Sequence, residues 1–89
     1  MKKQTVIITG ASSGIGKEAA RYFLERGDNV VINSTTKEKL EKAYQELGAG
    51  PHLAMVAGDV SKKATGEKLV ATAVEKFGSA DVLVNNAGI

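Results

Sequence analysis

The chain has 89 residues, of which 43% are hydrophobic and 25% are charged, and its formal net charge is +2. This composition is typical of one small globular domain and argues against a disordered chain. Positive and negative side chains are interleaved, so no basic patch indicates a nucleic-acid partner. The chain has no cysteine and one histidine, His52, which excludes a disulfide framework and argues against a metal site built by the protein.

The N-terminus is basic and is followed by the apolar residues 6–8, a pattern that resembles the start of a signal peptide. The apolar run stops at Thr9 and Gly10, which makes it too short for the hydrophobic region of such a peptide. No other segment approaches the length of a membrane span. We therefore expect a cytoplasmic protein with no membrane partner.

Strand-like and helix-like segments alternate along the chain. Unbroken apolar runs, rather than alternating ones, are typical of strands in a parallel sheet whose two faces are both covered. Right-handed crossovers then favour an α/β fold of the Rossmann type, with three layers and the strand order 3-2-1-4. The first two helices are expected on one face and the third on the other. The predicted strands are residues 6–9, 30–33, 53–57 and 82–85.

Three amphipathic segments separate the strands and predict helices. The first covers residues 14–26, the second follows the capping-box pair Thr35 and Glu38, and the third is expected to be capped by Ser61. The predicted apolar faces are Ile15, Ala19, Tyr22 and Phe23 in the first helix, Leu40, Ala43, Tyr44 and Leu47 in the second, and Val70, Ala73, Val74 and Phe77 in the third.

A glycine-rich turn connects the first predicted strand to the first predicted helix. Glycine leaves no Cβ atom where a ligand could approach, and backbone N–H groups at a helix N-terminus attract a phosphate group. In the predicted topology this turn opens onto the crevice between the first and fourth strands. The turn reads Thr9-Gly10-Ala11-Ser12-Ser13-Gly14-Ile15-Gly16.

Two further motifs follow later strands and map to the same edge of the sheet. Asp59-Val60 follows the third strand, and Asn85-Asn86-Ala87-Gly88 follows the fourth. With the glycine turn, they resemble the Thr-Gly-x-x-x-Gly-x-Gly, Asp-Val and Asn-Asn-Ala-Gly motifs of the short-chain dehydrogenase/reductase family. Their order and approximate spacing also match, and the resemblance covers the whole chain.

The resemblance implies the NAD(P)-binding portion of an oxidoreductase that transfers hydride between NADP(H) or NAD(H) and a carbonyl or hydroxyl group. No metal site is predicted. The implied cofactor contacts are Gly10, Gly14, Ile15 and Gly16 to the pyrophosphate and its ribose, Ser12 and Ser13 as hydrogen-bond donors, Asp59 and Val60 to the adenine, and Asn86, Ala87 and Gly88 near the nicotinamide-side ribose. Asn85 is expected to tie neighbouring strands. On the residues alone, Asp59 is also compatible with a plain turn before the third helix, and Asn86 with Gly88 is compatible with a plain turn.

The end of the second strand bears on the choice between the two nicotinamide cofactors. A carboxylate there would bind the ribose 2′-hydroxyl and repel a 2′-phosphate. The sequence has Ser34, Thr35, Thr36 and Lys37 instead, and no carboxylate before Glu38. We therefore predict NADP rather than NAD, with Ser34 and Thr35 in the site. The alternative, in which Thr35 only caps a helix and Lys37 is solvated, remains open, because this loop lacks the arginine that many NADP-binding relatives have.

The resemblance also implies a catalytic Ser and a Tyr-x-x-x-Lys pair that this sequence lacks. Tyr22 and Tyr44 are followed four residues later by Arg26 and Gly48, so we predict that both tyrosines are packing residues. No catalytic residue is assigned. Residues 1–89 are expected to be the N-terminal part of an NAD(P)-binding Rossmann domain, truncated after the fourth strand and inactive alone.

The fourth predicted strand would then have an open outer edge, which predicts a homo-oligomer formed by edge pairing or by exchange of elements. The main functional alternative is a non-catalytic module that binds a dinucleotide or another chain. An epimerase or dehydratase of the extended relatives is less favoured, because those proteins usually carry a different glycine spacing.

Overall fold

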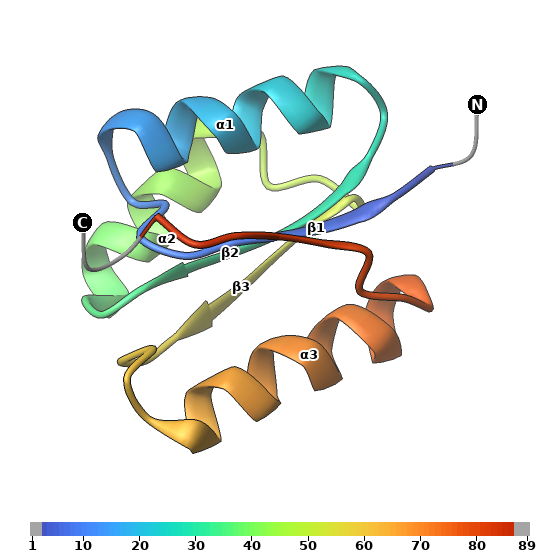
Figure 1. The fold of residues 1–89 in the computed structure, drawn as a ribbon. Coiled ribbons are helices and arrows are strands. Elements are labelled where there is room, and N and C mark those ends of the chain that lie inside the picture. The colour runs from blue at the N-terminus through green and yellow to red at the C-terminus, as the bar shows by residue number, and fades with distance from the viewer. Residues whose placement is uncertain (1–2, 87–89) are drawn as a thin grey trace.

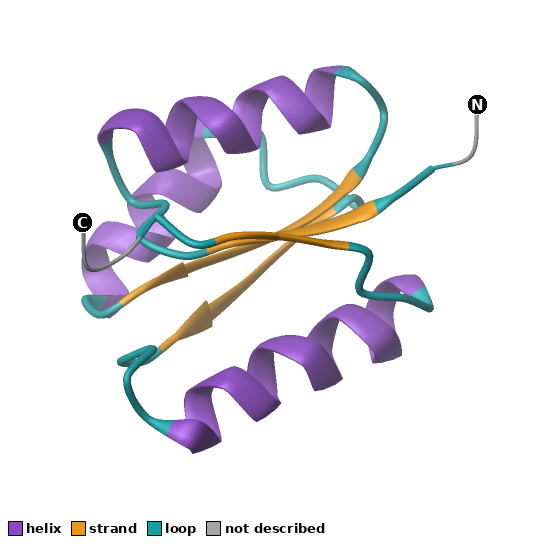
Figure 2. Cartoon of the chain, in the orientation of Figure 1, coloured by secondary structure: helices purple, strands orange, loops and turns teal. Residues whose placement is uncertain are grey.

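The computed structural model describes residues 3–86 of the chain. Strands and helices alternate without interruption, as the sequence predicts (Figure 2). Each of the predicted strands and helices is present. The elements are β1 (Thr5–Ile8), α1 (Gly14–Glu25), β2 (Asn29–Ser34), α2 (Lys37–Glu46), β3 (Leu53–Ala57), α3 (Lys63–Phe77) and β4 (Val82–Val84).

The strands form one parallel sheet in the order β3-β2-β1-β4. Helices α1 and α2 cover one face of this sheet, and α3 covers the other (Figure 1). The structure therefore confirms the α/β fold with three layers and the strand order 3-2-1-4. The carboxyl ends of β1 and β4 lie side by side, so the glycine turn and the segment after β4 meet at one edge of the sheet.

The core has two parts, one on each side of the sheet. In β1, Val6 and Ile8 belong to the cluster under α1 and α2, whereas Ile7 belongs to the cluster under α3. Successive side chains of a strand point to opposite faces, so an apolar residue is needed at every position when both faces are covered. This arrangement explains the unbroken apolar run from which β1 is predicted.

The predicted helix faces are partly wrong. Ile15 is 82% exposed, Tyr22 56%, Val70 50% and Val74 49%. In α3 the buried residues are Thr65, Leu69 and Ala73, so the buried stripe lies one position away from the two exposed valines.

The two tyrosines differ in their surroundings. Tyr44 packs against the core as predicted. The prediction for Tyr22 is wrong, because its ring lies at the surface and contacts the ring of Phe23 edge to face, with 5.2 Å between centroids. The guanidinium of Arg26 lies 5.8 Å from the Tyr22 ring centroid. Tyr22 therefore makes a local surface contact rather than filling the core.

Two predicted helix caps are also wrong. The N-cap of α2 is Thr36 rather than Thr35, and its side chain makes no capping hydrogen bond. The N-cap of α3 is Lys62 rather than Ser61. Ser61 instead donates its backbone N–H and its hydroxyl to Asp59 Oδ1, at 2.9 and 2.8 Å. This local turn competes with the helix for the backbone and delays the start of α3.

Candidate functional site

The three glycines of the turn serve two different purposes. Gly10 and Gly14 have positive φ angles of 62° and 59°, a conformation that glycine adopts without a steric cost. Gly16 lies buried in the first turn of α1, where an added Cβ would be 2.5 Å from the Gly10 carbonyl oxygen and 2.7 Å from Asn86 Nδ2. Gly16 therefore allows the helix to approach the end of β1 and the segment after β4.

The N-terminus of α1 is suited to an anion. Its N-cap residue, Ser13, makes no side-chain capping hydrogen bond, and the first turn contains no acidic residue. Unpaired N–H groups and the positive end of the helix dipole attract phosphate groups. Ile15 follows within this turn with its side chain exposed. This geometry is compatible with the predicted pyrophosphate contacts.

The segment after β4 is tied to the glycine turn. The Thr9 hydroxyl accepts a hydrogen bond from the backbone N–H of Asn86 at 2.9 Å and lies 3.3 Å from Asn85 Oδ1. Asn86 Nδ2 donates to the Gly10 carbonyl oxygen at 3.0 Å. Asn85 and Asn86 thus join the ends of β1 and β4, whereas Ala87 and Gly88 lie outside the described residues.

The end of β2 contacts the same turn from the other side. The Ser34 hydroxyl donates to the Ser12 hydroxyl at 3.1 Å and accepts from the Thr36 N–H at 3.4 Å. Ser34 is 6% exposed. Thr35 is exposed and does not cap α2. The capping part of the alternative is therefore wrong, whereas its other part, a solvent-exposed Lys37, is confirmed.

Asn33 lies near the end of β2 and belongs to none of the three motifs. Its side chain is buried, and Nδ2 donates to the carbonyl oxygens of Val56 and Gly58 at 3.0 and 3.1 Å. Its own carbonyl oxygen accepts from the N–H of Ala11 at 2.8 Å. The available signal was an amide at the end of a buried apolar strand, because a buried polar group requires partners.

Asp59 lies on the exposed turn after β3. A cavity of about 700 Å³ runs from this turn towards β4, and Thr9, Thr35, Asp59, Val60 and Asn85 are among its lining residues. Ser12, Ser13, Gly14 and Ile15 line a different hollow, between α1 and α2. The fold thus brings the predicted residues to one sheet edge but divides them between two sides of the glycine turn.

The hydrogen bonds from Ser61 hold the pKa of the Asp59 carboxyl below its ordinary value. Because the pKa is lowered by folding, the ionised Asp59 carboxylate stabilises the fold at pH values above the pKa that this carboxyl has in the unfolded chain. This contribution is lost as the pH falls through the lower pKa of the folded state. The backbone N–H of Ser61 lowers the Asp59 pKa more than the Ser61 hydroxyl does. We therefore expect Ser61→Ala, which removes only the hydroxyl, to raise the Asp59 pKa part of the way towards its ordinary value. A carboxyl-carbon NMR titration of both chains measures this shift, and an unchanged midpoint would contradict it.

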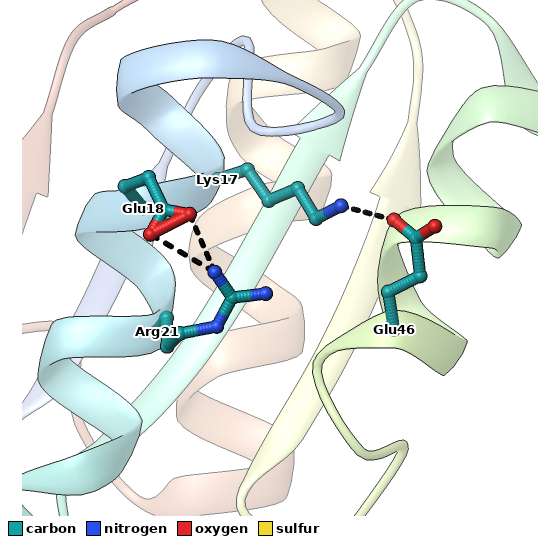
Figure 3. A network of polar contacts seen from close by, with 4 residues as sticks. All are labelled: Lys17, Glu18, Arg21 and Glu46. Atoms are coloured by element: carbon teal, nitrogen blue, oxygen red, sulfur yellow. Dashed lines mark hydrogen bonds and ion pairs between the residues drawn. The ribbon is translucent and has the colours of Figure 1, made fainter.

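Lys17 directly follows Gly16, the last glycine of the turn. It forms an ion pair with Glu46 that links α1 to α2, as Figure 3 shows. The hydrogen bond from Lys17 lowers the pKa of the Glu46 carboxyl. Arg21 and Glu18 form a separate pair within α1. In the free protein, the Lys17 ammonium group is therefore directed towards a carboxylate.

Residues 3–86 contain no cluster of three or more His, Cys, Asp or Glu side chains placed to hold a metal ion. Over the same range, no helix combines the length and the apolar character needed to cross a membrane.

The family model for short chain dehydrogenases matches residues 4–89. The chain therefore belongs to the short-chain dehydrogenase/reductase family, which confirms the resemblance seen in its motifs. It is 47% identical over 91 residues to an L-rhamnose 1-dehydrogenase (NAD(P)(+)) of Azotobacter vinelandii, covering 97% of this chain and 36% of the relative. The chain spans about a third of the length of the curated relatives that it matches.

Solved structures agree with this assignment. A 3-ketoacyl-(acyl-carrier-protein) reductase from Brucella melitensis, complexed with NADH, matches with a TM-score of 0.87 and 42% identity, covering 97% of this chain and 35% of that one. The L-sorbose reductase of Gluconobacter frateurii, complexed with NADPH and L-sorbose, matches with a TM-score of 0.87 and 34% identity, covering 99% and 34%.

Proposed function

We propose that residues 1–89 form the N-terminal part of an NAD(P)-binding Rossmann domain in a short-chain oxidoreductase. The observation that carries this proposal is the close approach at Gly16, where α1 meets the end of β1 and the side chain of Asn86. A dinucleotide pyrophosphate fits beside this approach, because the residues that begin α1 line an open hollow and N–H groups at a helix N-terminus attract phosphate. The chain's membership of the family supports the proposal.

The whole protein is proposed to interconvert a hydroxyl and a carbonyl group. The bound nicotinamide would supply or accept the hydride. Residues of this chain would bind and orient the cofactor: the glycine turn at its pyrophosphate, Asp59 and Val60 at the adenine, and the segment from Asn86 to Gly88 near the nicotinamide-side ribose. The sequence contains no Tyr-x-x-x-Lys pair, so we expect these residues alone to bind without turnover.

We further propose NADP(H) as the preferred cofactor, with NAD(H) as the alternative. Support comes from the end of β2, where no carboxylate opposes a 2′-phosphate and Thr35, next to Ser34, offers an exposed hydroxyl group. The hydroxyl of Thr35 is not used to cap α2 and lines the same cavity as Asp59. A relative whose name specifies NAD(P)(+) is compatible with either cofactor.

Binding of NADPH and NADH to the 89-residue chain tests this proposal. We expect saturable binding by calorimetry, with a lower Kd for NADPH, and no cofactor oxidation when carbonyl substrates are added. Absence of binding by both cofactors would contradict a dinucleotide site. An equal or lower Kd for NADH would contradict only the NADP preference. Measurable turnover would contradict the assignment of a binding portion.

We also propose that the chain forms a homo-oligomer in the cytoplasm. Among residues 3–86, no strand pairs with the outer edge of β4, and Leu83 on this strand is 63% exposed. Unpaired edges with apolar residues favour association between chains. Residues 6–8 lie buried in β1, so this apolar run belongs to the fold.

The edge of β4 makes this oligomer testable. We expect light scattering to give a mass above that of one chain, and Leu83→Lys to shift the population towards the monomer, because lysine on a strand edge opposes pairing. Val74→Lys places the same charge at an exposed apolar position of α3 that does not line the groove beside Leu83, and it serves as a control for edge pairing. A wild-type chain that stays monomeric at high concentration would contradict the proposal.

A further inference from the structure

Asn33 connects three parts of the proposed dinucleotide site. Its carbonyl oxygen accepts the N–H of Ala11 from the glycine turn at 2.8 Å. Its side-chain Nδ2 donates to the carbonyl oxygens of Val56, at 3.0 Å, and Gly58, at 3.1 Å. The residue is 1% exposed, so these bonds are shielded from competing water. Asn33 therefore bonds to the glycine turn through its backbone and to the turn after β3 through its side chain.

The turn at Gly58 is also held from its other side. Its N–H donates to the Ser34 carbonyl oxygen at 3.0 Å. An added Cβ at Gly58 would lie 2.8 Å from the Thr65 hydroxyl oxygen, which shows how closely α3 packs against this position. Gly58 is thus fixed between β2 and α3, and Asp59 is the next residue along the chain. Any movement of Gly58 would displace Asp59.

We propose that Asn33 is a positioning residue for the adenosine half of the cofactor, acting through the Gly58–Asp59 turn. This inference rests on the proposed function. An amide is suited to the task because its NH₂ group has two hydrogens, one for each carbonyl oxygen. A threonine hydroxyl has one hydrogen and a shorter reach. Aspartate would place oxygen atoms against two carbonyl oxygens, which repel them.

Binding of ADP-ribose, which carries the adenosine and pyrophosphate groups without nicotinamide, tests the role of Asn33. We expect Asn33→Ala in the 89-residue chain to raise the Kd for ADP-ribose about tenfold, because two hydrogen bonds that hold the Asp59 turn are lost. Asn29→Ala is the matched control. Asn29 lies at the opposite end of β2, where its Oδ1 contacts His52 Nδ1 at 2.9 Å, so its replacement should leave the Kd within twofold.

A second measurement needs no ligand. We expect the Gly58 amide to exchange with solvent faster in Asn33→Ala than in wild type, relative to the Val30 amide, which bonds to His52 near the start of β2. If Asn33→Ala does not fold, Asn33→Thr replaces it, because a β-branched residue fits a strand. For this variant a Kd raised at least threefold supports the role.

The possible outcomes separate this inference from the proposed function. If wild type does not bind ADP-ribose, the dinucleotide site itself is wrong, and this role of Asn33 is wrong with it. If wild type binds and a folded Asn33 variant keeps a Kd within twofold, only the role of Asn33 is overturned. An equal loss of affinity in Asn29→Ala would also overturn it, because the effect would then follow general destabilisation of β2.

Discussion

Gly16→Ala is expected to destabilise the fold by about 3 kcal/mol or more, at the upper end of the cost of overpacking. The added Cβ would lie 2.5 Å from the Gly10 carbonyl oxygen, which is a backbone atom, and 2.7 Å from Asn86 Nδ2, which donates to that same oxygen. To relieve this overlap, α1 must move away from the end of β1. The same movement opens the proposed pyrophosphate site, so dinucleotide binding should be lost even where the variant remains folded.

A second glycine provides a control for the Gly16 variant. Gly66 lies in α3, and an added Cβ there would meet no atom within 4 Å. Alanine has the higher helix propensity, so Gly66→Ala should stabilise the chain by up to about 1 kcal/mol. Urea unfolding of both variants measures the two changes. Equal free energies of unfolding would contradict the importance of the close approach at Gly16.

Ser34→Asp is expected to reverse the cofactor preference. Its carboxylate would lie beside the Ser12 hydroxyl and the Thr36 N–H, two groups that already contact the Ser34 side chain and can donate to it. The negative charge would then repel a 2′-phosphate and accept a hydrogen bond from a ribose 2′-hydroxyl. We expect the Kd for NADPH to rise at least tenfold, about 1.4 kcal/mol, while that for NADH stays unchanged or falls.

The uncharged variant Ser34→Asn separates charge from size. Asparagine has nearly the shape of aspartate but no charge. We therefore expect the ratio of the Kd for NADPH to the Kd for NADH to stay within about threefold of the wild-type ratio, which is well below the tenfold change expected for Ser34→Asp. Titration of each variant with NADPH and NADH gives these ratios. A similar shift in both variants would show that steric hindrance, rather than repulsion, determines the preference at Ser34.

The sheet could be predicted because its information is local. The apolar run at residues 6–8 indicates a strand covered on both faces, and right-handed crossovers leave few strand orders. The buried residues of the helices were harder to predict. Apolar residues at helical spacing define a broad helix face, and neighbouring elements determine which part of that face packs against the sheet. Val70 lines the groove next to Leu83, and no further element covers this groove among the described residues.

The site was predicted where a motif marks it and missed where distant atoms converge. The glycine spacing identifies the turn, but nothing near Asn33 in the sequence indicates Val56 and Gly58, which are 23 and 25 residues away. The cap of α2 depended on a choice between adjacent threonines, and the helix begins after Thr36. The cofactor roles of the predicted residues stay predictions for binding experiments.

The pairing of β1 with β4 has a consequence for the order of folding. The hydrogen bond from the Thr5 N–H to Asp81 joins residues 76 positions apart, whereas that from the Gln4 N–H to Asp28 spans 24. Closing the longer loop costs about 1 kcal/mol more in chain entropy. We therefore expect β4, which has only 3 residues, to dock late on a sheet of β1, β2 and β3. The crevice proposed for the dinucleotide would then be completed in the last folding step, so ligand binding would stabilise that step directly.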